Sequence, residues 1–147
     1  MAATRRAEAT WSGALTSGAG EVSAISSGAF SGLPVTWAAR TETAEGRTSP
    51  EELVAAAHAA CFSMALSGAL ARAGTPPERL DVSAEVTFDK LDAGWRVVSS
   101  ALTVRGTVPG MTVDDFAAAA ETAKDGCPIS VALTGNVALS VEATLEG

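Results

Sequence analysis

The fold is decided by residues 49–73, which read SPEELVAAAHAACFSMALSGALARA. Ser49 suits the N-cap of a helix, Pro50 suits its first turn, and Glu52 completes a capping box. A Gly-Thr-Pro sequence at residues 74–76 follows and favours a helix end. The segment therefore predicts one long helix. Because its residues are apolar nearly all round, we expect most of its faces to be buried.

The residues before this helix read as short strands joined by Gly/Ser turns. Apolar and β-branched residues between turn signals predict strands over Ala7–Trp11, Glu21–Ile25 and Val35–Arg40. A polar connector over Gly46–Ser49 then leads into the helix.

The residues after the helix alternate between apolar and polar, as half-buried strands do. One strand is expected over residues 80–88, with the Asp92-Ala93-Gly94 turn after it and a second strand from Trp95 to about Val108. A last strand covers residues 137–145. Because the strands are mostly linked as hairpins, we expect an antiparallel sheet.

Thr112 and Asp115 form a second capping box, which predicts a helix that runs to about Asp125. Gly126 is expected to end this helix in the left-handed conformation. Cys127 and Pro128 then open a short helical turn that reaches about residue 133. The order of elements is βββ-α-ββ-α-β, which indicates an α+β fold with helices packed on the sheet. No linker divides the chain, so residues 1–147 are expected to form a single domain.

Composition excludes several classes of protein. The chain has 147 residues, of which 47% are hydrophobic and 18% charged, and its net charge is −7. These values indicate a folded globular protein. No Lys/Arg cluster is present, so no nucleic-acid partner is expected. No stretch approaches the length of a membrane span, and the residues around Arg5 and Arg6 lack the apolar run of a signal peptide. We therefore expect a soluble, cytoplasmic protein with no membrane partner.

The long apolar helix also predicts assembly. A single sheet covers only one side of a helix that is apolar all round. A second copy of the chain is the simplest cover for the remaining faces, so a homodimer is expected.

The chain has two cysteines, Cys61 in the long helix and Cys127 before Pro128. A lone cysteine in an apolar helix is more often a small buried residue with a raised pKa, and it needs a nearby cation to react. Cys127 lies where free backbone N–H groups favour a thiolate, although a capping role is equally compatible with its position. The residues alone leave open which thiol attacks a substrate.

Two separate segments carry a resemblance to a known family. Pro50-Glu51-Glu52-Leu53 with Ala56-Ala57-His58-Ala59-Ala60-Cys61-Phe62-Ser63-Met64-Ala65 resembles the peroxidatic-cysteine helix of the OsmC/Ohr family. Ala123-Lys124 with Gly126-Cys127-Pro128-Ile129-Ser130 resembles its resolving-cysteine motif. Further matches are Asp89–Gly94, Val108–Met111 and Thr41-Glu42 after Arg40. Because no arginine lies between Arg6 and Arg40, the OsmC branch is favoured over the Ohr branch, with Arg40 in the role of the family's arginine.

This resemblance implies an OsmC-like fold in an intertwined homodimer and the activity of a cysteine-based peroxidase. Cys61 would reduce an organic hydroperoxide and become a sulfenic acid, and Cys127 would condense with it to a disulfide. Arg40 would keep Cys61 ionised, and Glu51 would hold Arg40 by a bidentate contact. No cofactor is implied, because the thiols do the chemistry. The resemblance also implies a thiol reductant, either a dithiol of the lipoyl type or a small thiol, rather than thioredoxin.

Helix geometry constrains this site. Glu51 and Cys61 are ten residues apart, so they stand about 15 Å apart along a straight helix. We therefore expect Glu51 to act across a dimer interface, so that it and Cys61 of the same chain do not surround one arginine. His58 is expected to be a packed, hydrogen-bonded histidine rather than a base.

The remaining large apolar residues leave alternatives open. Phe62, Met64 and Met111 suit either a pocket for alkyl peroxides or the core, and the tryptophans, namely Trp11, Trp37 and Trp95, are expected to be packing residues. Two other functions stay open as well. One is a binding protein of the same fold with negligible peroxide turnover, and the other is a redox sensor whose disulfide alters the binding of a partner.

Overall fold

The computed structural model describes residues 1–147, which divide into two compact units, Met1–Leu53 and Val54–Gly147. The boundary falls inside the long helix, which belongs mainly to the second unit. Each unit is described by itself.

The first unit is a three-stranded antiparallel sheet followed by a short helix. The strands are β1 (Ala7–Ser12), β2 (Ala19–Ala24) and β3 (Leu33–Val35), in that order across the sheet. The expected strand over Val35–Arg40 is wrong, because residues Trp37–Thr41 form helix α1. The hydroxyl of Thr36 caps this helix by accepting a hydrogen bond from Ala39 N at 3.1 Å, which places Arg40 in the last turn of a helix.

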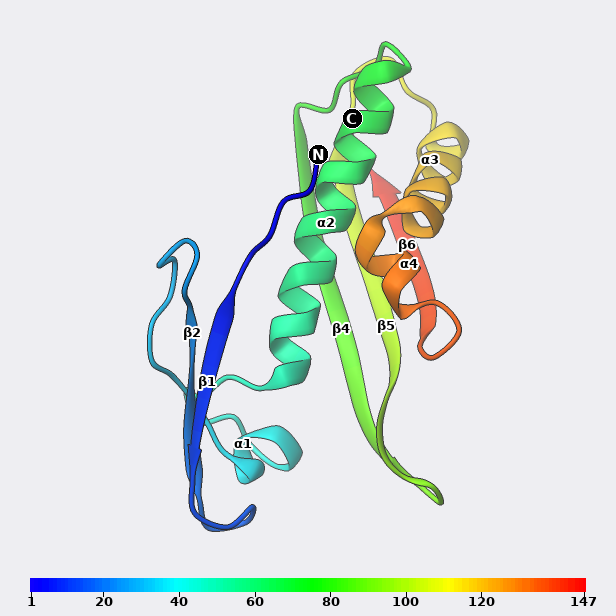
Figure 1. Cartoon of the computed structure of the whole chain (residues 1–147). Coiled ribbons are helices and arrows are strands. Elements are labelled where there is room, and N and C mark those ends of the chain that lie inside the picture. Colours follow the sequence, from blue (N-terminus) through cyan, green and yellow to red (C-terminus); the bar gives the residue numbers. More distant parts are fainter. The chain divides into compact units, whose positions relative to one another are not determined.

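The long helix α2 covers Pro50–Arg72 and begins as the capping box predicts (Figure 1). Ser49 Oγ accepts a hydrogen bond from Glu52 N at 3.1 Å. In the second unit, a row of α2 side chains at every fourth position is fully buried: His58, Phe62, Leu66 and Leu70. The expectation that most faces are buried is therefore wrong for a single chain, because Ala56, Ala57, Ala60 and Met64 are exposed.

Helix α2 also corrects the expectation about membrane spans. By length and apolar composition it is long enough to cross a bilayer. This is weak support for a span, because the core helix of a soluble protein passes the same test. Length and hydropathy therefore do not assign α2 to a membrane. The exposed apolar side chains of α2 named above still need a cover.

The second unit is built on a three-stranded sheet. β4 (Arg79–Leu91) and β5 (Gly94–Thr107) form the predicted antiparallel hairpin, with Leu91 paired to Gly94 across the turn. β6 (Ala138–Leu145) pairs with β5 in parallel, so the expectation of a purely antiparallel sheet is wrong. Parallel neighbours need a long crossover, and helices α3 and α4 provide it.

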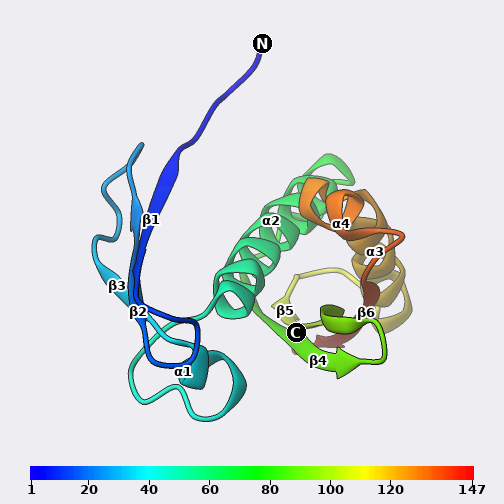
Figure 2. The ribbon, with the colours of Figure 1, turned by 60° about the horizontal axis from the view of Figure 1, so that its bottom comes forward.

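Helices α3 (Val113–Gly126) and α4 (Pro128–Leu133) lie with α2 on one face of this sheet (Figure 2). Gly126 is the last residue of α3 and does not have a positive φ, so the predicted left-handed end is wrong. Between α3 and β5, a Cβ on Gly106 would lie 2.5 Å from the ring of Phe116. Glycine at this position therefore lets the helix pack closely on the central strand.

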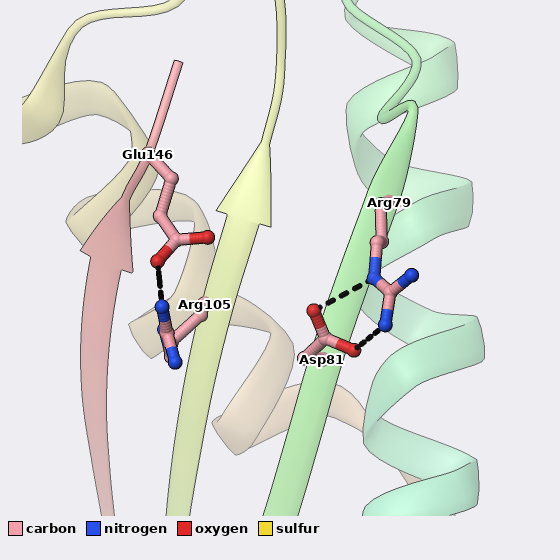
Figure 3. A network of polar contacts seen from close by, with 4 residues as sticks. All are labelled: Arg79, Asp81, Arg105 and Glu146. Atoms are coloured by element: carbon pink, nitrogen blue, oxygen red, sulfur yellow. Dashed lines mark hydrogen bonds and ion pairs between the residues drawn. The ribbon is translucent and has the colours of Figure 1, made fainter.

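The core of the second unit comes from α2, β5 and α3 together. Its fully or nearly fully buried apolar side chains are Phe62, Leu66, Leu70, Leu102, Val104, Val108, Phe116, Ala120, Ala123 and Cys127. The opposite face of the sheet is polar, and two ion pairs lie at one end of it (Figure 3). Arg79 pairs with Asp81 on β4, and Arg105 pairs with Glu146 beyond β6. Core packing thus covers one face of the sheet only.

Candidate active site

The joint between α3 and α4 positions Cys127. Its extended backbone ends α3, and its sulfur caps α4 by accepting a hydrogen bond from Ser130 N at 3.3 Å. A second contact of 3.3 Å joins the thiol to the Ser130 hydroxyl. The side chain is fully buried, so these contacts fix the sulfur within the core.

Cys61 lies on α2 and packs against the same core. Its thiol lies close enough to that of Cys127 for each to shift the pKa of the other, and the backbone of Ile129 acts on both sulfurs. Both cysteines are free thiols, Cys61 half-buried and Cys127 buried. The fold therefore brings together two sulfurs that come from positions 61 and 127 of the sequence.

The surroundings shift the pKa values of the two thiols in opposite directions. Burial raises the pKa of Cys61, and contact with Cys127 adds to this effect although a hydrogen bond from Ile129 opposes it. Burial also acts to raise the pKa of Cys127, but hydrogen bonds from the Ser130 hydroxyl and backbone, Cys61 and Ile129 outweigh it, so that pKa is lowered. Within the second unit no cation acts on Cys61. Its ionisation needs a charge from elsewhere.

His58 is one turn of α2 before Cys61, and it is the packed, hydrogen-bonded residue that the sequence predicts. It is fully buried, with Nδ1 2.6 Å from Ser100 Oγ and Nε2 2.8 Å from Ser130 Oγ. Burial lowers its pKa. Sequence reasoning missed Ser100 and gave Ser130 no role beyond its place in the resolving-cysteine motif, since the contacts that join both serines to His58 are visible only in three dimensions.

In the first unit, Arg40 and Glu51 form a three-bond contact. Arg40 Nε lies 3.1 and 3.0 Å from the two carboxylate oxygens, and Nη2 lies 2.7 Å from Oε1. Glu51 is 6% exposed, so its charge is held away from solvent. The guanidinium carbon also lies 5.9 Å from the centre of the Trp37 ring. These contacts fix the orientation of the guanidinium and hold its positive charge in place.

A cavity of about 290 Å³ opens beside this arginine. Its lining is mostly apolar and consists of Trp11, Leu15, Val35, Thr36, Trp37, Arg40 and Pro50. Two of the tryptophans that we expected to be packing residues thus line a cavity. Of the residues that suited either pocket or core, Phe62 is core, Met111 packs against the core, and Met64 is 71% exposed.

The sequence matches a known protein family and several of its members. The family model described as OsmC-like protein matches residues 43–142. The protein named Peroxiredoxin OsmC from Escherichia coli strain K12 is 41% identical over 138 residues, which cover 94% of this chain and 95% of that protein. Organic hydroperoxide resistance protein OhrA from Bacillus subtilis strain 168 is 33% identical over 70% of this chain and 72% of that protein. Both cysteine motifs lie in the matched region of the family model.

Solved structures show the same fold. An organic hydroperoxide resistance protein from Elizabethkingia anophelis superposes with a TM-score of 0.75 at 24% identity, over 99% of this chain and 100% of that chain. An OsmC-like protein of unknown function from Vibrio cholerae superposes with a TM-score of 0.76 at 17% identity, over 97% of this chain and 99% of that chain. With the family match over most of its length, the chain belongs to the OsmC-like protein family.

Proposed function

We propose that the chain is a thiol-dependent peroxidase that reduces organic hydroperoxides to alcohols. The names of its relatives, Peroxiredoxin OsmC and organic hydroperoxide resistance protein OhrA, support a peroxide-related redox role. The observation that supports the finer proposal is that the free thiols of Cys61 and Cys127 lie near enough for each to shift the pKa of the other. Two neighbouring thiols of suitable geometry can close to a disulfide.

In the proposed reaction the Cys61 thiolate attacks one peroxide oxygen and the O–O bond breaks. The alcohol leaves, and Cys61 becomes a sulfenic acid. The Cys127 sulfur then attacks the Cys61 sulfur, so that a disulfide forms and water leaves. A dithiol reductant of the lipoyl type restores both thiols by exchange.

Arg40 is assigned the role of the cation that Cys61 needs. Its guanidinium is held by Glu51 and faces the apolar cavity, so a peroxide with an apolar body would place its O–O end at the charge. An opposite charge within about 4–6 Å lowers the pKa of an acid by about 1 to 3 units, which opposes the effect of burial on Cys61. The apolar lining favours organic hydroperoxides over hydrogen peroxide.

Assembly completes the proposal. The exposed row of α2, formed by Ala56, Ala60 and Met64, is apolar and has small residues that permit close approach of a second helix. We propose that a second copy of the chain covers it in a soluble, cytoplasmic homodimer, with residues 1–147 acting as one functional domain. Since Arg40 binds Glu51 of its own chain, about 15 Å along α2 from Cys61, it would serve Cys61 of the partner subunit.

Thiol counting tests the activity. One equivalent of cumene hydroperoxide, added anaerobically to reduced protein, should remove two thiols within seconds. Cys61→Ser should abolish hydroperoxide consumption, whereas Cys127→Ser should consume one equivalent and stop at a sulfenic acid that a dimedone probe traps. Unchanged thiols in the native chain would instead favour a binding protein of this fold. Slow disulfide formation without catalytic turnover in the presence of a dithiol would favour a redox sensor.

Complementation tests the shared site. Alone, Arg40→Ala should turn over hydroperoxide only very slowly and Cys61→Ser should not turn it over at all. In a mixed dimer of the two, Cys61 comes from one chain and Arg40 from the other, so one site is complete. Random exchange of subunits should restore about a quarter of the native activity, because half of the dimers are mixed and each has one of two sites intact. No recovery after demonstrated exchange would place Arg40 and Cys61 of one chain in the same site.

A further inference from the structure

A line of hydrogen bonds runs from Cys127 into the core of the second unit. The Cys127 sulfur lies 3.3 Å from Ser130 Oγ, which lies 2.8 Å from His58 Nε2, and His58 Nδ1 lies 2.6 Å from Ser100 Oγ. All four side chains have an exposed fraction of 0%. The line is therefore closed to solvent and begins at a sulfur to which the proposed reaction assigns chemistry.

The protonation states of Cys127 and His58 are linked through the Ser130 hydroxyl. A serine hydroxyl has one proton and donates to one partner at a time. When Cys127 is a thiol, its S–H donates to Ser130 Oγ, and the Ser130 O–H is available to His58 Nε2. When Cys127 is a thiolate, its sulfur accepts from the Ser130 O–H instead. His58 Nε2 must then have a proton of its own to donate to the Ser130 oxygen.

We infer that His58 takes up and returns the proton of Cys127 through the Ser130 hydroxyl while the disulfide closes and opens. The inference rests on the proposed function. His58 touches neither sulfur nor substrate in this scheme, so it is a positioning residue, and Ser130 is the group in contact with the reacting sulfur.

Closing of the disulfide moves one proton to His58. The Cys127 proton moves to Ser130 Oγ while the Ser130 proton moves to His58 Nε2. The Cys127 sulfur forms the S–S bond, the S–O bond of the Cys61 sulfenic acid breaks, and the hydroxide that leaves takes a proton from the solvent to become water. On opening, a thiolate of the dithiol reductant attacks the Cys61 sulfur. Cys127 leaves as a thiolate and regains its proton from Ser130, which is resupplied by His58 Nε2.

The surroundings of the line suit this transfer. Burial lowers the pKa of His58, so its imidazole is neutral at neutral pH and can accept a proton. α2 presents Cys61 to Cys127, while β5 and α4 present only the Ser100 and Ser130 hydroxyls to His58. On α3, Lys124 is paired with Glu121 and Asp125. The titratable partner that acts on Cys127 directly is therefore Cys61, and its pKa is raised.

A packing role for His58 would make different predictions. A histidine that only joins α2 to β5 and α4 needs its hydrogen bonds but not its titration. Glutamine at this position retains a donor and an acceptor but cannot take up a proton near neutral pH. His58→Gln therefore separates the two roles, and Ser130→Ala interrupts the line independently.

The first experiment follows a single turnover with stopped-flow. In His58→Gln and Ser130→Ala, sulfenic acid formation should keep its native rate, while disulfide closure at pH 7 should slow by about 10²-fold, the usual contribution of a positioned proton acceptor. The closure rate of both variants should recover about tenfold per pH unit as the solution becomes more alkaline. Thr122→Ala, which removes a hydroxyl bonded to the Ala118 carbonyl of α3, is the matched control and should close at the native rate. Native closure rates and pH profiles in both line variants would overturn the inference.

The second experiment does not depend on peroxide. In a Cys61→Ser background, the pH profile of thiolate absorbance at about 240 nm reports the ionisation of Cys127 alone, and it needs no reagent to reach the buried sulfur. Adding His58→Gln or Ser130→Ala should shift the midpoint to higher pH, and Thr122→Ala should leave it in place. An unshifted midpoint in both line variants overturns the inference whatever the enzyme does. A native chain that consumes no hydroperoxide, with shifted midpoints, would instead sink the proposed function and leave the proton line standing.

Discussion

The two units of this chain differ in the kind of chemistry that they supply. The Val54–Gly147 unit holds both sulfurs, with uncharged partners: two serine hydroxyls, a neutral imidazole and backbone groups. The Met1–Leu53 unit holds an arginine fixed by a buried carboxylate beside an apolar cavity. One unit has nucleophiles without a fixed charge, and the other has a fixed charge without a nucleophile.

This difference teaches why a peroxidase of this kind would divide its site. Burial protects a sulfenic acid from solvent but raises the pKa of Cys61. A cation beside the thiol reverses that shift, yet a cation that is buried permanently needs its own carboxylate partner. In the proposed site, Glu51 would balance the charge of Arg40 before the arginine meets a thiol.

Removal of the charge should have the largest effect. Arg40→Ala should slow hydroperoxide consumption by about 10²- to 10³-fold at pH 7, because Cys61 then keeps its raised pKa and each unit of pKa above the ambient pH costs about tenfold in thiolate. Stopped-flow consumption and the alkylation profile of Cys61 in a Cys127→Ser background measure both effects. Arg47→Ala, an exposed arginine of the same unit, is the control. Equal rates for the two variants would show that the first unit does not supply the charge that Cys61 needs.

Removal of the carboxylate should have a smaller effect. Glu51→Gln leaves Arg40 charged but replaces charged hydrogen bonds by neutral ones, so the guanidinium is held less firmly. We expect a reduction of about tenfold in the rate of hydroperoxide consumption. Glu52→Gln changes the neighbouring acid, whose carboxylate accepts from the Thr48 hydroxyl at 2.8 Å, and should leave the rate near native. A loss for Glu51→Gln as large as that for Arg40→Ala would mean that Glu51 acts on the reaction more directly.

Within the sulfur-bearing unit, two glycines should respond oppositely to alanine. Gly106→Ala forces a Cβ against the Phe116 ring and should lower the free energy of unfolding by about 1 to 3 kcal/mol. Gly126→Ala meets no atom within 4 Å and lies in a helix, so it should raise that free energy by up to about 1 kcal/mol. Urea denaturation measures both. A neutral Gly106→Ala would show that α3 can move away from β5.

The smallest effect concerns acid. His58 is the only histidine, and burial lowers its folded-state pKa below the unfolded value of about 6.5. Below that pH the unfolded chain binds the proton more readily than the folded chain, so stability present above about pH 6.5 is lost as the pH falls, by up to about 1.4 kcal/mol per pH unit. The native chain should therefore lose more of its free energy of unfolding than His58→Gln between pH 7 and pH 5.5 in urea denaturation. Equal losses would show that His58 protonates freely in the fold.

Local signals predicted much of the fold. The Ser49 capping box gave the start of α2, the Thr112 capping box gave the start of α3, and the turn at Asp92 gave the β4–β5 hairpin. Strand direction was not predictable, because the alternation over residues 137–145 reads the same for a parallel and an antiparallel neighbour. Helix α1 was missed because five residues are too few to show a helical period.

The site was predictable where it depends on motif and not where it depends on packing. The contact between Arg40 and Glu51 and the nearness of the two thiols involve the residues that the family resemblance singled out. Ser100, the contact of Ser130 with His58 and the cavity lined by Trp11 and Trp37 have no local signature. Their positions follow from which strand and helix meet His58, and from how β1 and α1 pack.

The parallel pairing of β5 and β6 determines where this chain tolerates inserted residues. Because the two strands point the same way, the polypeptide must return along the sheet between them, and Cys127 lies at the joint of the two helices that make this return. A residue inserted in the turn after Leu133 lengthens a surface loop. One inserted in α3 just before the joint rotates the residues that follow by about 100° and carries the sulfur away from its neighbour. Natural variation in length should therefore collect beyond Leu133 and spare the joint.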